Sequence, residues 1–184
     1  MSFKAGLPPV ARSDARLFVL GSLPGDASLA ARRYYAHPTN QFWRLLGRAI
    51  GEELQSVPYE QRLDRLAARR IGLWDVIASA HRAGGLDQAI REAEHNRIEH
   101  LLHDFPELAA IGFNGAAATA AGRKLIGEPP PRITLIDLPS SSAAEVEQSD
   151  LRGRLRAVDD PLQLEEHPGE LRVIFAQPHQ LRHA

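Results

Sequence analysis

The chain has 184 residues, of which 43% are hydrophobic and 24% charged, a composition typical of one globular domain of ordinary size. It contains no cysteine, which excludes disulfides, thiolate metal sites and thiol nucleophiles. The formal net charge of -1 draws the chain toward neither nucleic acids nor cationic partners, so any binding to DNA has to use local basic patches.

No segment predicts a membrane span or a secretory signal. The longest run without a charged residue covers 108–122 and is interrupted by Gly, Asn and Thr, whereas a bilayer span needs roughly 20 apolar residues. The N-terminal residues MSFKAGLPPVARSDAR lack the apolar core of a signal peptide. We therefore expect a cytoplasmic protein.

The first half of the chain predicts two strands and two helices. A strand over 16–21 ends in the turn Gly-Ser-Leu-Pro-Gly. A helix follows, because its apolar residues have the spacing of one buried face: Phe42, Leu45, Leu46, Ala49 and Ile50. Pro38 fits just before this helix or within its first turn. A second helix is predicted over 58–70 and a second strand over 71–78.

The second half continues this alternation. A helix is predicted over 94–103, a strand over 108–113, and an alanine-rich helix ending near Ile126. A fourth strand covers 132–138. Ser142 and Glu145 have the spacing of a capping box, which predicts a further helix, and a last strand is expected at 171–176.

Apolar strands that alternate with helices predict an α/β fold. We expect a three-layer α/β/α sandwich with a central, mainly parallel four-stranded sheet. Ligands of such sheets bind outside the carboxyl ends of the strands, which directs attention to 22–28, Asp75, Asn114 and 139–142. The functional part is predicted to be 1–147, with 148–184 as a C-terminal helix and tail of the same domain.

An aromatic cluster adds to this expected site. Within ten residues the chain places Tyr34, Tyr35, Phe42 and Trp43, although aromatic residues make up only 6% of the sequence. Such a cluster near a strand end indicates a pocket for a flat ligand. The alternative, that Phe42 and Trp43 belong to the helix core, stays open at this point.

Five motifs follow consecutive predicted strands or the loops between them: GSLPG, YYAHPTNQFW, LWDVIAS, FNG and LPSSSAA. In this order and spacing, over about 15–147, they resemble the uracil-DNA glycosylase superfamily, and most closely its hypoxanthine (deoxyinosine) DNA glycosylase branch. The AHPxNxFW and PSSSA segments are shared with the mismatch-specific uracil/thymine branch.

The resemblance implies catalytic positions at Asn40 and Ser22. Asn40 would orient a water under C1′ while the base leaves, and its alternative role is that of a helix N-cap. Ser22 stands where the family usually has an Asn or Asp that holds the attacking water. Leu138 stands where classical uracil glycosylases carry a histidine that stabilises the leaving base, which argues against a fast, uracil-only enzyme.

The resemblance also implies residues that bind the base. Tyr35 would stack on the extruded base. A carboxylate at Asp75 would accept the N1–H of hypoxanthine and repel adenine, whose N1 is an acceptor, so one hydrogen bond would select the deaminated base. Gly21 and Asn114 are further base contacts, Asn114 a weak one that can equally be a plain turn residue. Asp75 can instead cap a turn or pair with an arginine.

The expected DNA contacts are the loop residues Pro139, Ser140, Ser141 and Ser142, together with Arg44 and Arg48 on the predicted helix. Small hydroxyl side chains and free N–H groups suit phosphate oxygens, and Arg32 and Arg33 can add charge. The alternatives are a helix cap for Ser142 and ordinary solvated arginines.

The implied function is that of a monofunctional DNA-deoxyinosine glycosylase, which hydrolyses the N-glycosidic bond and leaves an abasic site. The only lysines, Lys4 and Lys124, lie outside the motifs, so no amine nucleophile for a lyase step is indicated. We expect no metal, no cofactor, no membrane partner and a monomer. The expected partner is double-stranded DNA with a deaminated base, and single-stranded DNA is a further possible substrate. The expected location is the cytoplasm of a bacterial-type cell. The alternatives are a mismatch-specific uracil/thymine glycosylase and a catalytically silent DNA-binding relative.

Overall fold

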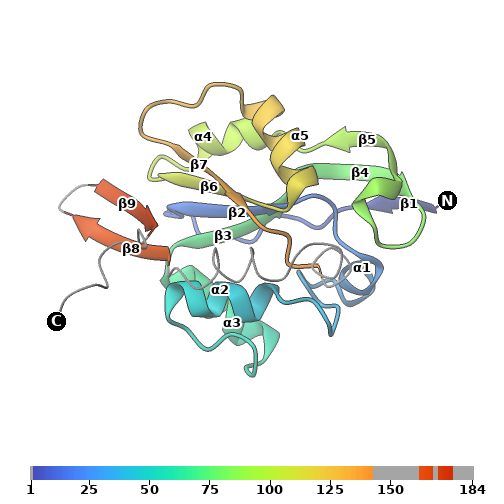
Figure 1. Ribbon diagram of the computed structural model, residues 1–184, viewed down its shortest axis with the longest axis horizontal. Coiled ribbons are helices and arrows are strands. Elements are labelled where there is room, and N and C mark those ends of the chain that lie inside the picture. Colours follow the sequence, from blue (N-terminus) through green and yellow to red (C-terminus); the bar gives the residue numbers. More distant parts are fainter. Residues whose placement is uncertain (1, 143–161, 168–169, 176–184) are drawn as a thin grey trace, which may run out of the picture.

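The computed structural model describes residues 2–142 and the backbone of 162–167 and 170–175. Its centre is a sheet of parallel strands in the order β3-β2-β6-β7 (Figure 1). These strands are β2 (Leu17–Gly21), β3 (Ile71–Asp75), β6 (Ala110–Asn114) and β7 (Thr134–Leu138). The predicted α/β class with a four-stranded parallel sheet is confirmed.

Helices cover both faces of this sheet. α2 (Phe42–Ile50) and α3 (Tyr59–Ala68) lie on one face, and α4 (Leu101–Asp104) and α5 (Ala116–Ile126) lie on the other (Figure 1). In β2, Phe18 and Leu20 pack into the core cluster of α4 and α5, whereas Val19 packs into that of α2 and α3. Burial on both faces explains why β2 is a continuous apolar run.

A second, antiparallel sheet stands beside the first. It contains β1 (Ser2–Ala5), β4 (Ile77–Arg82) and β5 (Ile90–His95). The single strand predicted over 71–78 is therefore wrong, because the chain changes sheets at Val76. The N–H groups of Val76 and Ile77 donate to the carbonyls of Gly21 and Ser22, at 2.8 and 2.9 Å. Asp75 is thereby left at the carboxyl end of β3, beside Gly21.

The helix predicted over 94–103 is wrong in its first part. Glu94 and His95 belong to β5, and the helical residues are the short η2 (Ile98–His100) and α4. Asn96 lies between them and bonds to the end of β3, with its N–H on the Val76 carbonyl and its Nδ2 on the Asp75 carbonyl, both at 2.9 Å. Such contacts with a distant strand override local helix propensity.

The remaining predicted elements have clear counterparts. The helices expected near Phe42, over 58–70 and up to Ile126 correspond to α2, α3 and α5. The strand expected at 171–176 corresponds to β9 (Glu170–Phe175), which pairs with β8 (Leu162–His167). α1 (Asp26–Ala31), η1 (Asp87–Ala89), β1 and β5 were not predicted. The helix expected from Ser142 onward lies outside the described residues. None of the described helices is long and apolar enough to cross a bilayer.

Candidate active site

A cavity of about 470 Å³ opens at the carboxyl ends of the parallel strands. Its walls come from the segments that follow β2, β3, β6 and β7 and from the connection between α1 and α2. It gathers these residues predicted from the sequence: Gly21, Ser22, Tyr35, Asn40, Asp75, Asn114, Ser140, Ser141 and Ser142. Pro139, Arg44 and Arg48, predicted as DNA contacts, lie outside its lining.

One wall is a neutral hydrogen-bonded network, which we call the amide–serine side (Tyr35, Asn40, Asn114, Ser140 and Ser141). Asn114 Nδ2 donates to Ser141 Oγ at 2.9 Å and to Tyr35 Oη at 3.2 Å. Asn114 Oδ1 accepts from the Ser141 N–H at 3.2 Å. Asn114 thus connects Tyr35, between α1 and α2, to Ser141, in the loop after β7 that we call the serine loop (Ser140–Ser142). Its amide holds these two side chains in position.

Tyr35 is fixed both by its backbone and by its ring. Its φ of 52° lies in the left-handed region, and its ring stacks on Phe42 with centroids 3.6 Å apart and planes 11° apart. Burial raises the pKa of its phenol, which stays neutral. Phe42 covers one face of the ring, so a flat ligand can stack only on the other. Phe42 and Trp43 themselves are buried in the core, which confirms the alternative that they belong to the helix core.

Asn40 lines the cavity at the start of α2. Its Oδ1 accepts the Phe42 N–H at 2.9 Å, which satisfies a donor of the first helical turn. The N-cap residue of α2 is Gln41, so the predicted alternative of an N-cap at Asn40 is wrong by one residue, and the Asn40 side chain forms a turn just before the helix. An amide oxygen has two lone pairs and the amide nitrogen two N–H groups, so this hydrogen bond still permits Asn40 to hold a water.

A second side of the cavity carries two carboxyl groups, and we call it the carboxyl side (Ser22, Asp75 and Asp87 in the lining, with the buried Arg82 beside Asp87). Asp75 is 3% exposed, and its Oδ2 has no hydrogen-bond partner among the described residues. Gly21 is required beside it, because a Cβ there would lie 2.5 Å from Asp75 Oδ1 and 3.2 Å from Tyr35 Oη.

The charge of Asp75 differs from the sequence-based expectation. Burial, reinforced by the negative charge of Asp87, raises the pKa of the Asp75 carboxyl to about 8, and the positive charge of Arg82 only partly opposes this. At neutral pH the group is a carboxylic acid and not the carboxylate that was expected. It therefore offers an O–H donor as well as a carbonyl acceptor.

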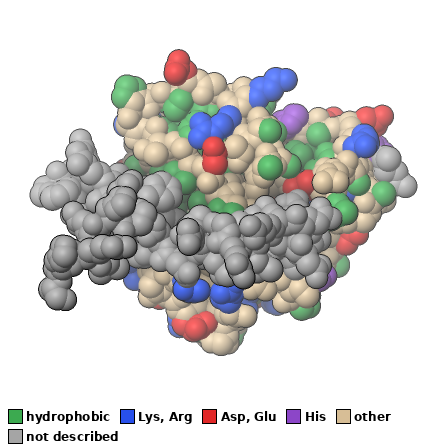
Figure 2. Space-filling model, in the orientation of Figure 1, with side chains coloured by type: hydrophobic (Ala, Val, Ile, Leu, Met, Phe, Trp, Pro, Cys, Tyr) green, Lys and Arg blue, Asp and Glu red, His purple; other side chains and the backbone are tan. Residues whose placement is uncertain are grey.

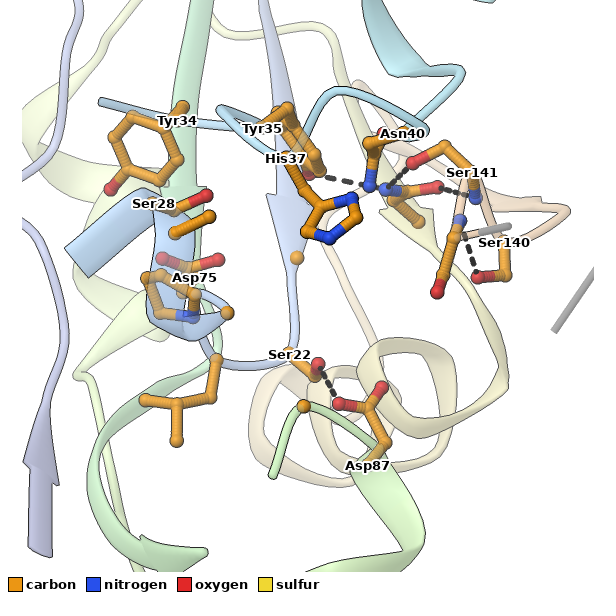
Figure 3. Close-up of a pocket in the computed structure, with 18 of the residues that line it drawn as sticks. Ser22, Ser28, Tyr34, Tyr35, His37, Asn40, Asp75, Asp87, Ser140 and Ser141 are labelled. Atoms are coloured by element: carbon orange, nitrogen blue, oxygen red, sulfur yellow. Dashed lines mark hydrogen bonds between the residues drawn. The ribbon is translucent and has the colours of Figure 1, made fainter. Parts of the chain in front are cut away.

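Ser22 and Asp87 face each other across the cavity wall (Figure 3). Ser22 Oγ donates to Asp87 Oδ1 at 2.7 Å, over a sequence separation of 65 residues. Arg82 is 1% exposed and lies 3.8 Å from the same carboxylate oxygen. Asp87 and His37 both line the cavity, and the sequence analysis placed neither among the site residues. No motif marks Asp87, because its neighbour Ser22 is distant in the chain.

The arginines predicted to contact DNA lie outside the lining of the cavity. Arg44 Nε donates to Gln41 Oε1 at 2.7 Å, Arg33 pairs with Glu60 at 2.9 Å, and Arg48 is exposed on α2. On the face drawn in Figure 2, blue Lys and Arg side chains occupy several separate places and are mixed with red acidic ones. Within the described ranges, no three His, Asp or Glu side chains come together as a metal-binding group.

Comparison with known proteins shows which family and which relatives this chain resembles. Residues 8–163 match the family model of the uracil DNA glycosylase superfamily. A hypoxanthine DNA glycosylase from Methanosarcina barkeri is 46% identical over 112 residues, covering 61% of this chain and 71% of the relative. One from Methanosarcina acetivorans is 44% identical over 115 residues, covering 62% and 73%. A solution NMR structure from the latter organism, described as a candidate uracil DNA glycosylase, superimposes with a TM-score of 0.71 at 40% identity, covering 82% of this chain and 92% of that one.

Proposed function

Because the chain belongs to the uracil DNA glycosylase superfamily, we propose that it is a hypoxanthine DNA glycosylase that flips the deaminated base out of DNA and hydrolyses its N-glycosidic bond. The observation that carries this proposal is the neutral, buried carboxyl of Asp75 in the cavity wall. The two relatives named as hypoxanthine DNA glycosylases support the same substrate.

The edge of hypoxanthine matches what Asp75 offers. The base presents an N1–H donor beside an O6 acceptor, and a carboxylic acid presents a carbonyl acceptor beside an O–H donor. Hydrogen bonds between Asp75 and the extruded base would therefore match donor with acceptor. Since Asp75 Oδ2 has no partner among the described residues, pairing with a base would satisfy a buried polar atom.

The neutral state of Asp75 changes the argument about adenine. A carboxylic acid can also pair with adenine, with its carbonyl on N6–H and its O–H on N1, so this contact alone does not exclude the normal base. Selection then depends on extrusion, because a mispaired or damaged base costs less to flip than a base in a normal pair. Hypoxanthine opposite a base with which it pairs poorly should therefore be released fastest.

Other residues supply the remaining steps. The open face of the Tyr35 ring stacks on the base, and Phe42 supports that ring from behind. Asn40 orients a water toward C1′. The loop of Pro139 and Ser140–Ser142 contacts backbone phosphates, with Arg44 and Arg48 as outer phosphate contacts. The reaction needs no metal or cofactor, and it leaves an abasic site.

A specific observation also favours a second substrate. The N3–H and O4 of uracil form the same donor and acceptor pair as the N1–H and O6 of hypoxanthine, so Asp75 can read both bases. The second candidate is therefore a mismatch-specific uracil/thymine glycosylase. In either case the substrate places the enzyme, working as a monomer, with chromosomal DNA in the cytoplasm.

A panel of duplexes tests the proposal. Each carries hypoxanthine, uracil, xanthine or thymine opposite each normal base, and strand breaks after alkaline treatment report base release. Breaks at hypoxanthine support the proposed activity. Breaks mainly at uracil or thymine opposite guanine favour the second candidate, and binding without any break leaves a silent DNA-binding protein.

A further inference from the structure

Hydrolysis of the glycosidic bond is accelerated by a group that takes a proton from the attacking water. As the water oxygen bonds to C1′, the C1′–N9 bond breaks and its electron pair stays on the departing hypoxanthine, which is then protonated from solvent. One proton of the water must go to a base near C1′. An amide such as Asn40 can orient the water but cannot hold that proton.

Three carboxyl groups line the cavity among the described residues: Asp26, Asp75 and Asp87. Asp75 is already protonated at neutral pH. The Asp26 side chain is 64% exposed to bulk water, whereas that of Asp87 is 21% exposed. Asp87 is the carboxyl group left for this role.

Asp87 is held in position from two sides. The Ser22 hydroxyl donates to its Oδ1 at 2.7 Å, and the buried guanidinium of Arg82 lies 3.8 Å from the same atom. Arg82 is itself anchored by donating to the carbonyls of Leu23, at 3.0 Å, and Pro24. The turn after β2 and the loop before β5 are thereby fastened together at the cavity wall.

We infer that Asp87, held by Ser22 and Arg82, is the catalytic carboxylate that accepts the proton of the attacking water. The inference rests on the proposed glycosylase function and adds a residue to it. Ser22 lacks a carboxylate or amide of its own, and the structure supplies one there from a distant segment. Asp75 and Asp87 then have different roles, because their partners differ: Asp75 reads the base and Asp87 activates the water.

The test is single-turnover release of hypoxanthine as a function of pH. The titratable and charged groups that face Asp87 are Arg82 from β4, Asp75 at the end of β3 and the Tyr35 phenol. In the parent protein the rate should rise with pH as Asp87 ionises and fall above about pH 8 as Asp75 ionises. Asp87→Asn should lower the rate at pH 7 about 100-fold or more and abolish the rise at acid pH.

The acid limb separates this role from a structural one. Removal of the Asp87 charge should move the alkaline limb to lower pH in either case, because that charge raises the pKa of Asp75. Asp87→Glu, which restores a carboxylate, should recover the rate to within about tenfold of the parent and restore the acid limb. Ser22→Ala, which removes only the hydroxyl that holds the carboxylate, should lose about tenfold and keep the acid limb.

Asp137→Asn is the matched control, because it makes the same change at an exposed carboxyl group that is paired with Arg123 and lies outside the cavity lining. It should release hypoxanthine at the rate of the parent. Affinity for a duplex with a tetrahydrofuran abasic analogue, measured by fluorescence anisotropy, should be equal in all these variants.

The outcomes distinguish the inference from the proposed function. If the parent releases hypoxanthine and Asp87→Asn does so within threefold of it with the acid limb intact, the inference is wrong and the proposed function stands. If the parent releases no base from any duplex, both are wrong. Should Asp87→Asn not fold, Ser22→Ala decides: a rate equal to that of the parent overturns the inference.

Discussion

The two walls of the cavity are built on different principles. On the amide–serine side every interaction described is between neutral groups, and Asn114 makes three hydrogen bonds to Tyr35 and Ser141. On the carboxyl side Asp75 and Arg82 are buried near Asp87, and Asp75 keeps an oxygen without a partner among the described residues. A network whose hydrogen bonds are satisfied costs little free energy, whereas burying a carboxyl group without a partner is unfavourable and is typical of functional sites.

This difference indicates that the two sides have different functions. The amide–serine side holds Tyr35 and the serine loop in fixed positions before DNA arrives. The carboxyl side carries the groups whose protonation matters to the reaction. Variants on the carboxyl side should therefore change activity and its pH dependence strongly, and variants on the amide–serine side should act mainly through stability and positioning.

The largest effect is expected at the Asp75 carboxyl. Asp75→Ala removes the hydrogen bonds to the base edge and should lower single-turnover release of hypoxanthine about 1,000-fold, because unpaired polar edges are rejected strongly. Asp75→Asn keeps a donor and an acceptor and should stay within about tenfold of the parent. Equal rates for Asp75→Ala and Asp75→Asn would show that Asp75 does not read the base.

The same group should make stability depend on pH. The folded protein keeps the Asp75 proton up to about pH 8, well above the ordinary pKa of 3.8. Below about pH 4 Asp75 is protonated in the folded and in the unfolded protein, and the contribution of its raised pKa to stability is fully present. As the pH rises from about 4 to 8, the unfolded chain alone releases the proton, and the free energy of unfolding falls by on the order of 1 kcal/mol per pH unit.

Urea unfolding at pH 5 and pH 8 measures this slope. Asp75→Asn cannot titrate at this position. Its free energy of unfolding should therefore fall by about 3 kcal/mol less than that of the parent between pH 5 and pH 8. Asp137→Asn, at an exposed carboxyl paired with Arg123, is the control and should keep the parental slope. A parental slope in Asp75→Asn would mean that another group is responsible.

Gly21→Ala tests the contact between the two walls. Its Cβ would lie 2.5 Å from Asp75 Oδ1 and 3.2 Å from Tyr35 Oη, so the carboxyl has to move away from its position. We expect about a 30-fold loss in release of hypoxanthine, since small displacements of a positioned group are costly. Gly25→Ala adds a Cβ with no atom within 4 Å and should change the rate less than twofold.

The smallest effect is expected on the amide–serine side. Asn114→Ala removes the hydrogen bonds to Tyr35 and Ser141 and should cost about 2 kcal/mol of stability in urea unfolding. The rate should fall about tenfold with an unchanged pH profile. Asn114→Asp keeps an acceptor for the Ser141 N–H and should be intermediate in stability. A large change in the pH profile of Asn114→Ala would contradict the division between the two walls.

Much of this protein could be predicted before its structure. Local apolar runs and turn residues predicted the parallel strands, and the motifs after them placed Asp75, Asn114 and Ser140–Ser142 at one edge of the sheet. The prediction failed where contacts between distant segments decide the conformation. The change of sheets at Val76 and the bonds of Asn96 to the end of β3 are examples.

The sequence by itself determined the fold class, the family and most of the residues around the cavity, because strand patterns and motif spacing are local properties of the chain. Only the tertiary structure decided that Asp75 is a neutral acid, that Asn114 is a connector and that Asp87 meets Ser22. The physical reason is that charge state and pairing depend on burial and on neighbours. For Ser22 and Asp87 those neighbours lie 65 residues apart and come together only in the folded chain.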